Sequence, residues 1–118
     1  LTMLTHADPV PGRTLVIWHS ATWFYLDRPA RVEIRSAIRK LANRATPKAP
    51  VVHVSWEWKR DSPDPAMPYA LVGRSWPAGG AWAPWRPGTS VQLGTGSAHG
   101  MPMRWAEPKP LPSDPLEV

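Results

Sequence analysis

Two polar side chains, His19 and Ser20, directly follow the apolar run at residues 15–18. Such a run is typical of a strand that is covered on both faces, and in open α/β sheets ligands bind beyond the carboxyl ends of strands. An imidazole at that position could shuttle protons or contact a ligand. We therefore predict catalytic roles for both residues. The alternative is a histidine bonded to backbone, beside a serine that caps the following turn.

A carboxylate, Glu57, lies near the end of a second strand predicted over residues 51–58. If the two strands are parallel, Glu57 shares a sheet edge with His19 and could orient the imidazole or bind a cationic ligand. We take it as the third catalytic candidate. These residues and His99 lack the tight spacing of metal ligands, so we predict no metal site. The structural alternative for Glu57 is an ion pair with a nearby cation: Lys59, Arg60 or Arg74.

Two aromatic side chains, Trp76 and His99, are candidates for ligand binding. Trp76, together with Trp82 and Trp85, could stack on a base, a sugar or a methylammonium group, or instead pin a loop to the domain. His99 precedes Gly100, which permits a close backbone approach, so it could line a pocket or a lid. Its alternative role is packing in a turn.

A basic amphipathic helix must connect the two strands. Asp27 is a typical N-cap, and Pro29 falls in the first turn, where no intrahelical hydrogen bond is lost. Apolar side chains then recur at helical spacing as one stripe: Ile34, Ala37, Ile38, Leu41 and Ala45. Pro47 and Pro50 end the helix. The order strand, helix, strand predicts a βαβ unit with parallel strands and a right-handed crossover.

Shorter elements complete the predicted fold. We expect a third strand over residues 69–76, a short strand over 90–94, and a last strand over 101–105 that runs antiparallel to the third. Residues 1–13 are predicted to be a lead-in loop, and residues 106–118 an extended, proline-rich tail. The predicted class is α/β: a partial Rossmann-like sheet with one βαβ unit followed by an antiparallel β-hairpin.

This predicted sheet lacks cover. Fully apolar parallel strands need helices on both faces, yet the sequence contains one long helix. Residues 81–88 are rich in tryptophan and proline and are expected to be a connection. We infer that a missing N-terminal half or a partner chain supplies the second layer.

Composition narrows the class of protein. The 118 residues carry a net charge of +5 and contain no cysteine, so disulfides and thiolate metal sites are excluded. No apolar run is long enough to span a bilayer and no secretory signal is visible, so we expect a cytoplasmic protein without a membrane contact. The charge excess falls on the helix, which could be a nucleic-acid footprint or an ordinary solvated face: Arg31, Arg35, Arg39, Lys40 and Arg44.

An ordered set of residues resembles a bacterial family. It comprises His19-Ser20, Trp23, Tyr25, Arg31, Ala49-Pro50, Glu57, Trp76-Pro77-Ala78-Gly79, His99-Gly100 and Trp105. The set, spread over about residues 14–105, resembles the C-terminal third of the family Domain of Unknown Function 2332. Tyr25, a member of the set, joins the ligand-binding candidates. The chain departs from the family at His53, where tryptophan is expected.

The resemblance implies a divergent relative of Rossmann-like methyltransferases, with residues 14–105 as the C-terminal half of the domain. It implies S-adenosylmethionine as the cofactor of a full-length parent. The glycine-rich turn that would hold this cofactor is absent from the sequence, so the chain alone is not expected to be active.

Three functions follow from these observations. The first is a fragment of a methyltransferase-like protein that lacks the cofactor-binding half, with His19, Ser20 and Glu57 lining a cleft. The second is a nucleic-acid-binding module built from the basic helix and the aromatic loop. The third is a structural subdomain without activity, which predicts no pocket near His19 and an exposed apolar face of the sheet.

Overall fold

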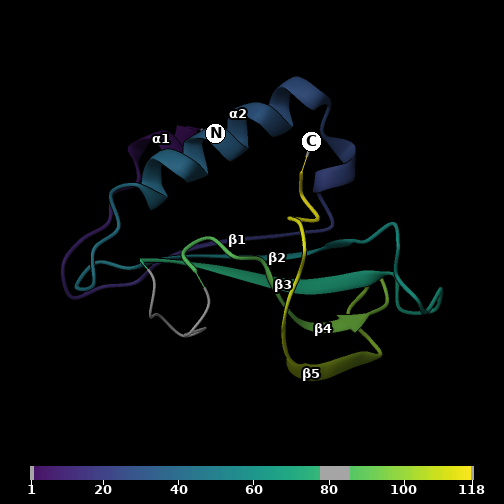
Figure 1. Cartoon of the computed structure of the whole chain (residues 1–118). Coiled ribbons are helices and arrows are strands. Elements are labelled where there is room, and N and C mark those ends of the chain that lie inside the picture. Colours follow the sequence, from purple (N-terminus) through teal and green to yellow (C-terminus); the bar gives the residue numbers. More distant parts are fainter. Residues whose placement is uncertain (1, 78–85, 118) are drawn as a thin grey trace.

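The computed structural model describes residues 2–77 and 86–117. Two α-helices lie over one face of a five-stranded sheet, and the chain ends beside the longer helix (Figure 1). The elements, in chain order, are α1 (Thr2–His6), β1 (Leu15–Ser20), the 3-10 helix η1 (Trp23–Tyr25), α2 (Arg28–Ala42), β2 (Val51–Trp58), β3 (Tyr69–Trp76), β4 (Val91–Gly96) and β5 (Met103–Pro110).

The sheet follows the order β1-β2-β3-β4-β5. Strands β1 and β2 are parallel, as the βαβ prediction requires, and Leu15 pairs with Val51. The later strands form an antiparallel meander, with β3 beside β2 and β4 beside β3. The last strand was expected to pair with the third strand, but β5 pairs with β4. Each strand after β2 therefore turns back on its immediate predecessor.

Helix α2 begins and packs as its sequence predicts. The Asp27 side chain accepts a 2.9 Å hydrogen bond from the backbone N–H of Ala30, which satisfies one free donor of the first turn. Ile38 and Leu41 are buried, 6% and 1% exposed. The helix ends at Ala42, before the predicted stripe does, and the N–H groups of Arg44 and Ala45 close turns on the carbonyl oxygens of Leu41 and Ala42.

Both ends of the chain differ from expectation. The predicted lead-in loop contains α1. Arg44, two residues past the end of α2, holds the segment just after α1 by bonding the Ala7 carbonyl oxygen at 3.1 Å and Asp8 at 3.0 Å. The predicted tail begins inside β5. Its prolines are compatible with this strand because β5 is at the edge of the sheet, where one side needs no ladder hydrogen bonds.

The opposite face of the sheet has a small apolar core. Trp56, Tyr69 and Leu71 pack there, with Met103 of β5 against them. Gly96 is required at this position, because a Cβ atom would lie 2.7 Å from the Trp56 ring.

On the same face, three large side chains stay exposed: Val16 (57%), Trp18 (56%) and Trp58 (46%). A doubly wound fold carries helices on both faces of its sheet, whereas the helices among residues 2–77 and 86–117 lie on one. The structure therefore supports a mixed α/β sheet with one parallel pair. None of its described helices is long and apolar enough to cross a membrane.

Candidate functional site

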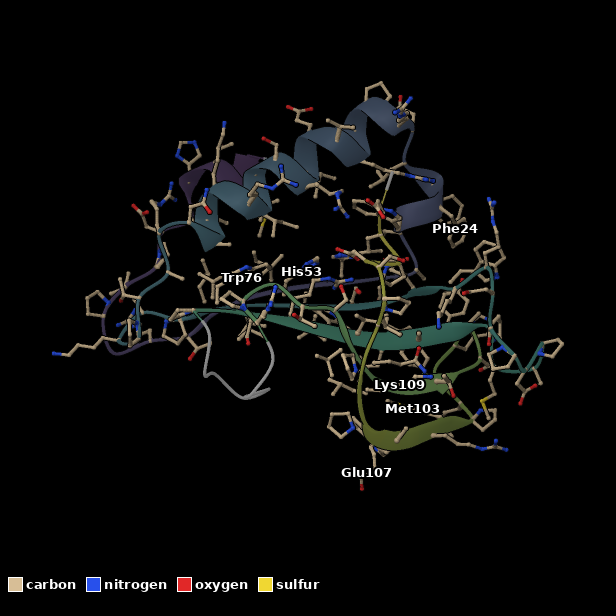
Figure 2. The ribbon with its side chains drawn as sticks, in the orientation of Figure 1. Phe24, His53, Trp76, Met103, Glu107 and Lys109 are labelled. Atoms are coloured by element: carbon tan, nitrogen blue, oxygen red, sulfur yellow. The ribbon has the colours of Figure 1, made fainter. Side chains whose placement is uncertain are left out.

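Three titratable side chains meet on the face of the sheet below α2. Side chains alternate along a strand, and His19 pairs with Ser55, so the residues two before and two after Ser55 flank it on the same face. Glu57 Oε1 lies 2.8 Å from His19 Nδ1. His53 Nε2 lies 2.8 Å from His19 Nε2. Figure 2 shows His53 rising from the sheet toward the helix.

The Glu57 carboxylate has several donors. It accepts backbone N–H bonds from Thr22 (3.1 Å) and Trp23 (3.1 Å) and a 3.2 Å bond from the Thr22 hydroxyl. Burial opposes ionisation, but the hydrogen bonds from His19, Trp23 and Thr22 together outweigh it and lower the pKa of Glu57 below its usual value. The turn after β1 therefore holds an ionised carboxylate against the imidazole.

His53 is the neutral partner in the hydrogen-bonded series Glu57–His19–His53, and it is 3% exposed. Burial, then the charges of Arg74 and His19, lower the pKa of His53 to about 2. An ionised carboxylate can only accept, so Nδ1 of His19 carries a proton. Nε2 of His19 either accepts from the Nε2–H of His53 or, when protonated, donates to it. The three groups can thus accommodate a proton on His19 while the heavy atoms stay in place.

An apolar groove of about 490 Å³ runs along β1 and includes His19 in its wall. The His19 side chain is 17% exposed. Trp23 lines the same groove and stacks on the imidazole, with ring centroids 5.8 Å apart. Its buried Nε1–H has no hydrogen-bond partner in the described part of the chain. A buried donor without an acceptor is costly, so a ligand or water acceptor would stabilise this position.

A comparison with protein families shows to which family the chain belongs. A model of an uncharacterised protein family conserved in bacteria, DUF2332, matches residues 1–105. The chain belongs to the DUF2332 family. No curated protein and no solved structure matched it significantly. Membership confirms the family that the residue pattern indicated, but the match does not support the expected placement in the C-terminal third or a methyltransferase-like nature, and it assigns no reaction.

The DUF2332 chain brings together two of the three predicted catalytic residues. His19 and Glu57 are in contact, whereas strand alternation places Ser20 on the opposite face, where it pairs with Trp56. The expected alternative for Glu57, an ion pair with a neighbouring cation, is replaced by its contact with His19. Arg74, one of the three cations considered, instead pairs with Asp114.

The ligand-binding candidates lie away from His19. Tyr25 is 78% exposed and contacts Phe24, with ring centroids 4.3 Å apart. His99 is exposed in the turn between β4 and β5. Trp76 lines a second cavity, beside His53. Trp82 and Trp85 lie outside the described residues. Among the residues that the structure describes, we find no group of three side chains placed to hold a metal ion.

Sequence reasoning missed His53 and Trp23 as site residues. The signal for His53 was present: in β2 the polar residues His53, Ser55 and Glu57 alternate with apolar ones, which places all three on one face. Nothing in the sequence indicates that the indole N–H of Trp23 is left without a partner.

The basic helix is partly occupied by internal contacts. Arg31 donates to the carbonyl oxygens of Trp23 and Leu26, at 3.1 and 2.9 Å. Arg35 pairs with Asp114, and Arg44 with Asp8. Guanidinium groups held in this way are less available to phosphates, so the nucleic-acid surface stays a prediction that these contacts do not favour.

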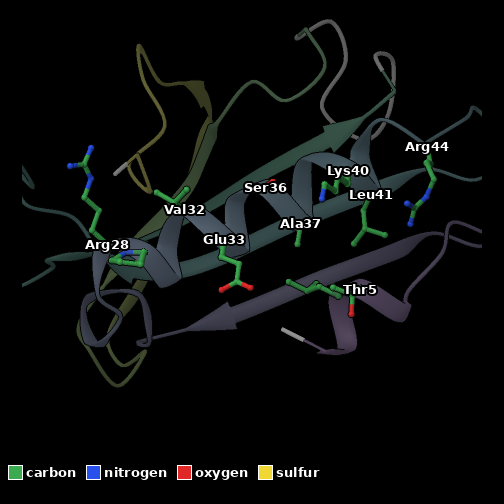
Figure 3. Close-up of a pocket in the computed structure, with 11 residues that line it drawn as sticks. Thr5, Arg28, Val32, Glu33, Ser36, Ala37, Lys40, Leu41 and Arg44 are labelled. Carbon is green, nitrogen blue, oxygen red and sulfur yellow. The ribbon is translucent and has the colours of Figure 1, made fainter.

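Another cavity, of about 860 Å³, lies between α1 and α2 (Figure 3). It runs along the flank of α2 past Glu33, Ser36 and Lys40. His19, His53 and Glu57 do not line it. The smaller groove at His19 is therefore the better candidate for chemistry.

Proposed function

We propose that this DUF2332 chain contributes an acid–base site to an enzyme, with His19 as the group that exchanges a proton with a bound ligand. One observation carries the proposal: Glu57 and His53 hold the two nitrogens of His19 at 2.8 Å each, beside a groove that can admit a ligand. A histidine oriented by a carboxylate is a recurrent general base.

Each residue has a distinct role. Glu57 is a positioning residue: it fixes the tautomer with the proton on Nδ1 and stabilises the imidazolium when it forms. The ligand first replaces His53 as the hydrogen-bond partner of His19 Nε2. The Nε2 lone pair of His19 then takes a proton from an O–H or N–H group of the ligand. When the ligand has left and His19 has given up the proton, the Nε2–H of His53 again donates to Nε2 of His19. The proton is returned to product or solvent, so the site is regenerated.

The groove indicates the class of ligand. Its lining is largely aliphatic and aromatic, including Met3, Leu15, Ile17, Leu26 and Ile34. We infer a small molecule with an apolar portion that lies along β1 and a polar head at His19. The unpaired Nε1–H of Trp23 could donate to an acceptor on that head.

A methyltransferase role has weaker support. A parallel βαβ unit is compatible with it. However, the turn after β1 contains no glycine, and its backbone N–H groups at Thr22 and Trp23 are already bonded to Glu57. These residues do not fit a cradle for S-adenosylmethionine, so our proposal uses no such cofactor. The position of this chain within a longer parent, and a covering half or partner chain on the exposed face, remain proposals.

Carbethoxylation by diethyl pyrocarbonate tests the proposal, because the lone pair of a neutral imidazole nitrogen attacks a carbonyl carbon of the reagent. We expect His19 to be modified, and Glu57→Gln to slow its modification several-fold because the tautomer is no longer fixed. The exposed residues His6 and His99 are internal controls whose rates should not change between the two proteins. Mass spectrometry of peptides gives each rate separately.

Two results would count against the proposal. One is a His19 that stays unmodified after His6 and His99 have reacted fully. The other is a His19 that reacts at the same rate in the Glu57→Gln variant, with melting curves showing both proteins folded.

A further inference from the structure

A second cavity, of about 210 Å³, lies between α2, the end of β3 and the C-terminal segment. Three guanidinium groups line it, from Arg35, Arg39 and Arg74. Among the described residues that line it, Asp114 supplies the one carboxylate. The cavity therefore has a formal excess of two positive charges, counted as three arginines less one aspartate.

The central cation, Arg74, is buried in the sheet and 2% exposed. Its Nη2 and Nε bond the two oxygens of Asp114, at 2.7 and 3.2 Å, and its Nη1 donates to the Ser55 hydroxyl at 3.2 Å. Arg35 donates to the same carboxylate at 3.3 Å. This two-pronged geometry matches a planar carboxylate, which a guanidinium binds through two parallel hydrogen bonds.

The acidic partner comes from a different part of the chain than the cations. Arg35, Arg39 and Arg74 lie inside residues 1–105, the region that matches the family, and Asp114 lies beyond it. A buried guanidinium without a counter-charge is strongly unfavourable. The family-matched region thus contains a cluster of arginines whose counter-ion must come from elsewhere, from a tail or from a ligand.

We propose that this cavity is a binding site for a small carboxylate-bearing molecule, and that the Asp114 side chain occupies the position of the ligand carboxylate when no ligand is bound. The ligand carboxylate replaces Asp114 on Arg74 and Arg35. The rest of the ligand fills the remaining space, which Asn43 and Trp76 also line. Arg39 has an exposed side chain with no bonded partner in the described part of the chain, so it stays available for a second acidic group.

This inference is independent of the proposed function, since binding requires no property of His19. The two sites are nevertheless adjacent, because His53 lines the cavity and bonds His19.

The test removes the Asp114 carboxylate. In Asp114→Ala, we expect succinate to bind about tenfold more tightly than in the unmodified chain, corresponding to about 1.4 kcal/mol. Succinate should also raise the melting temperature of the variant, whereas chloride at matched ionic strength should not. Adding Arg35→Gln to the variant should remove the gain. Glu117→Gln, an exposed acidic residue of the same segment, is the matched control and should not gain affinity.

A parallel titration with inorganic phosphate distinguishes the kind of oxyanion. Succinate binding tighter than phosphate supports the proposal, and phosphate binding tighter overturns the carboxylate assignment. If Asp114→Ala does not fold, Asp114→Asn keeps the side-chain volume and is titrated in the same way. An Asp114 variant that gains no affinity for either probe, or a gain that survives Arg35→Gln, means that the ion pair is only a structural latch.

Discussion

At the scale of single residues, the polar layer under α2 depends on neighbours that hold each charge. Glu57 stays ionised because donors from the turn after β1 surround it, and His53 stays neutral because it is buried beside Arg74. The same neighbours explain what could be predicted. Strand ends placed His19 beside Glu57, whereas Ser20 was misplaced because one residue along a strand reverses the face.

The buried state of His53 makes a prediction about pH. Its pKa is about 2 in the folded chain and about 6.5 when unfolded, so below pH 6.5 the unfolded chain binds a proton that the folded chain does not. The stability that the neutral, buried His53 contributes to folding is therefore fully present above pH 6.5 and is lost as the pH falls. We expect the free energy of unfolding to decrease by up to about 1.4 kcal/mol per pH unit from this group.

Urea denaturation at pH 7.5, 6 and 5 measures this slope, in a window above the titration of the carboxylates. His53→Gln, which keeps hydrogen-bonding capacity and cannot titrate, should flatten it. An unchanged slope in that variant would show that another group causes the dependence.

At the scale of elements, helix α2 and the two parallel strands follow from local signals, namely a cap, an apolar stripe and β-branched runs. Helix α1 and the full length of β5 do not. α1 has five residues and is held by contacts from Arg44 to the segment just after it rather than by its own propensity. β5 contains prolines, which in the sequence indicate an extended tail rather than a strand. They are compatible with a strand here because β5 lies at the edge of the sheet.

The cap of α2 gives a prediction at this scale. Asp27→Ala removes the acceptor for the Ala30 N–H, and we expect a loss of about 1 kcal/mol in the free energy of unfolding. Chemical denaturation measures it. Asp61→Ala, at an exposed position in the loop before β3, is the control and should change stability by less than about 0.5 kcal/mol. Equal losses in both variants would show that the cap has no special role.

At the scale of the whole molecule, the C-terminal segment joins the helix layer to the sheet. Asp114 pairs with Arg74 of β3 and Arg35 of α2, and Leu116 is 2% exposed. Sequence reasoning missed this return because the contacts with Arg74 span 40 residues and those with Arg35 span 79. Long-range pairing of this kind leaves no local pattern.

Deletion of residues 113–118 should therefore destabilise the fold. It removes a buried leucine and leaves Arg74 without its counter-charge, which together should cost about 3–5 kcal/mol. Urea denaturation of the shortened and full chains measures the difference. A loss below about 1 kcal/mol would mean that the segment is dispensable to the fold.

The state of the His19 and His53 imidazoles is the most direct test of the account. Long-range proton–nitrogen NMR spectra report which ring nitrogen carries the proton, and His19→Gln and His53→Gln assign the signals. We predict a protonated Nδ1 on His19 at pH 7, and a neutral His53 that remains neutral down to pH 5. A His53 that gains its proton near pH 6.5, or a His19 with an unprotonated Nδ1, would contradict the account.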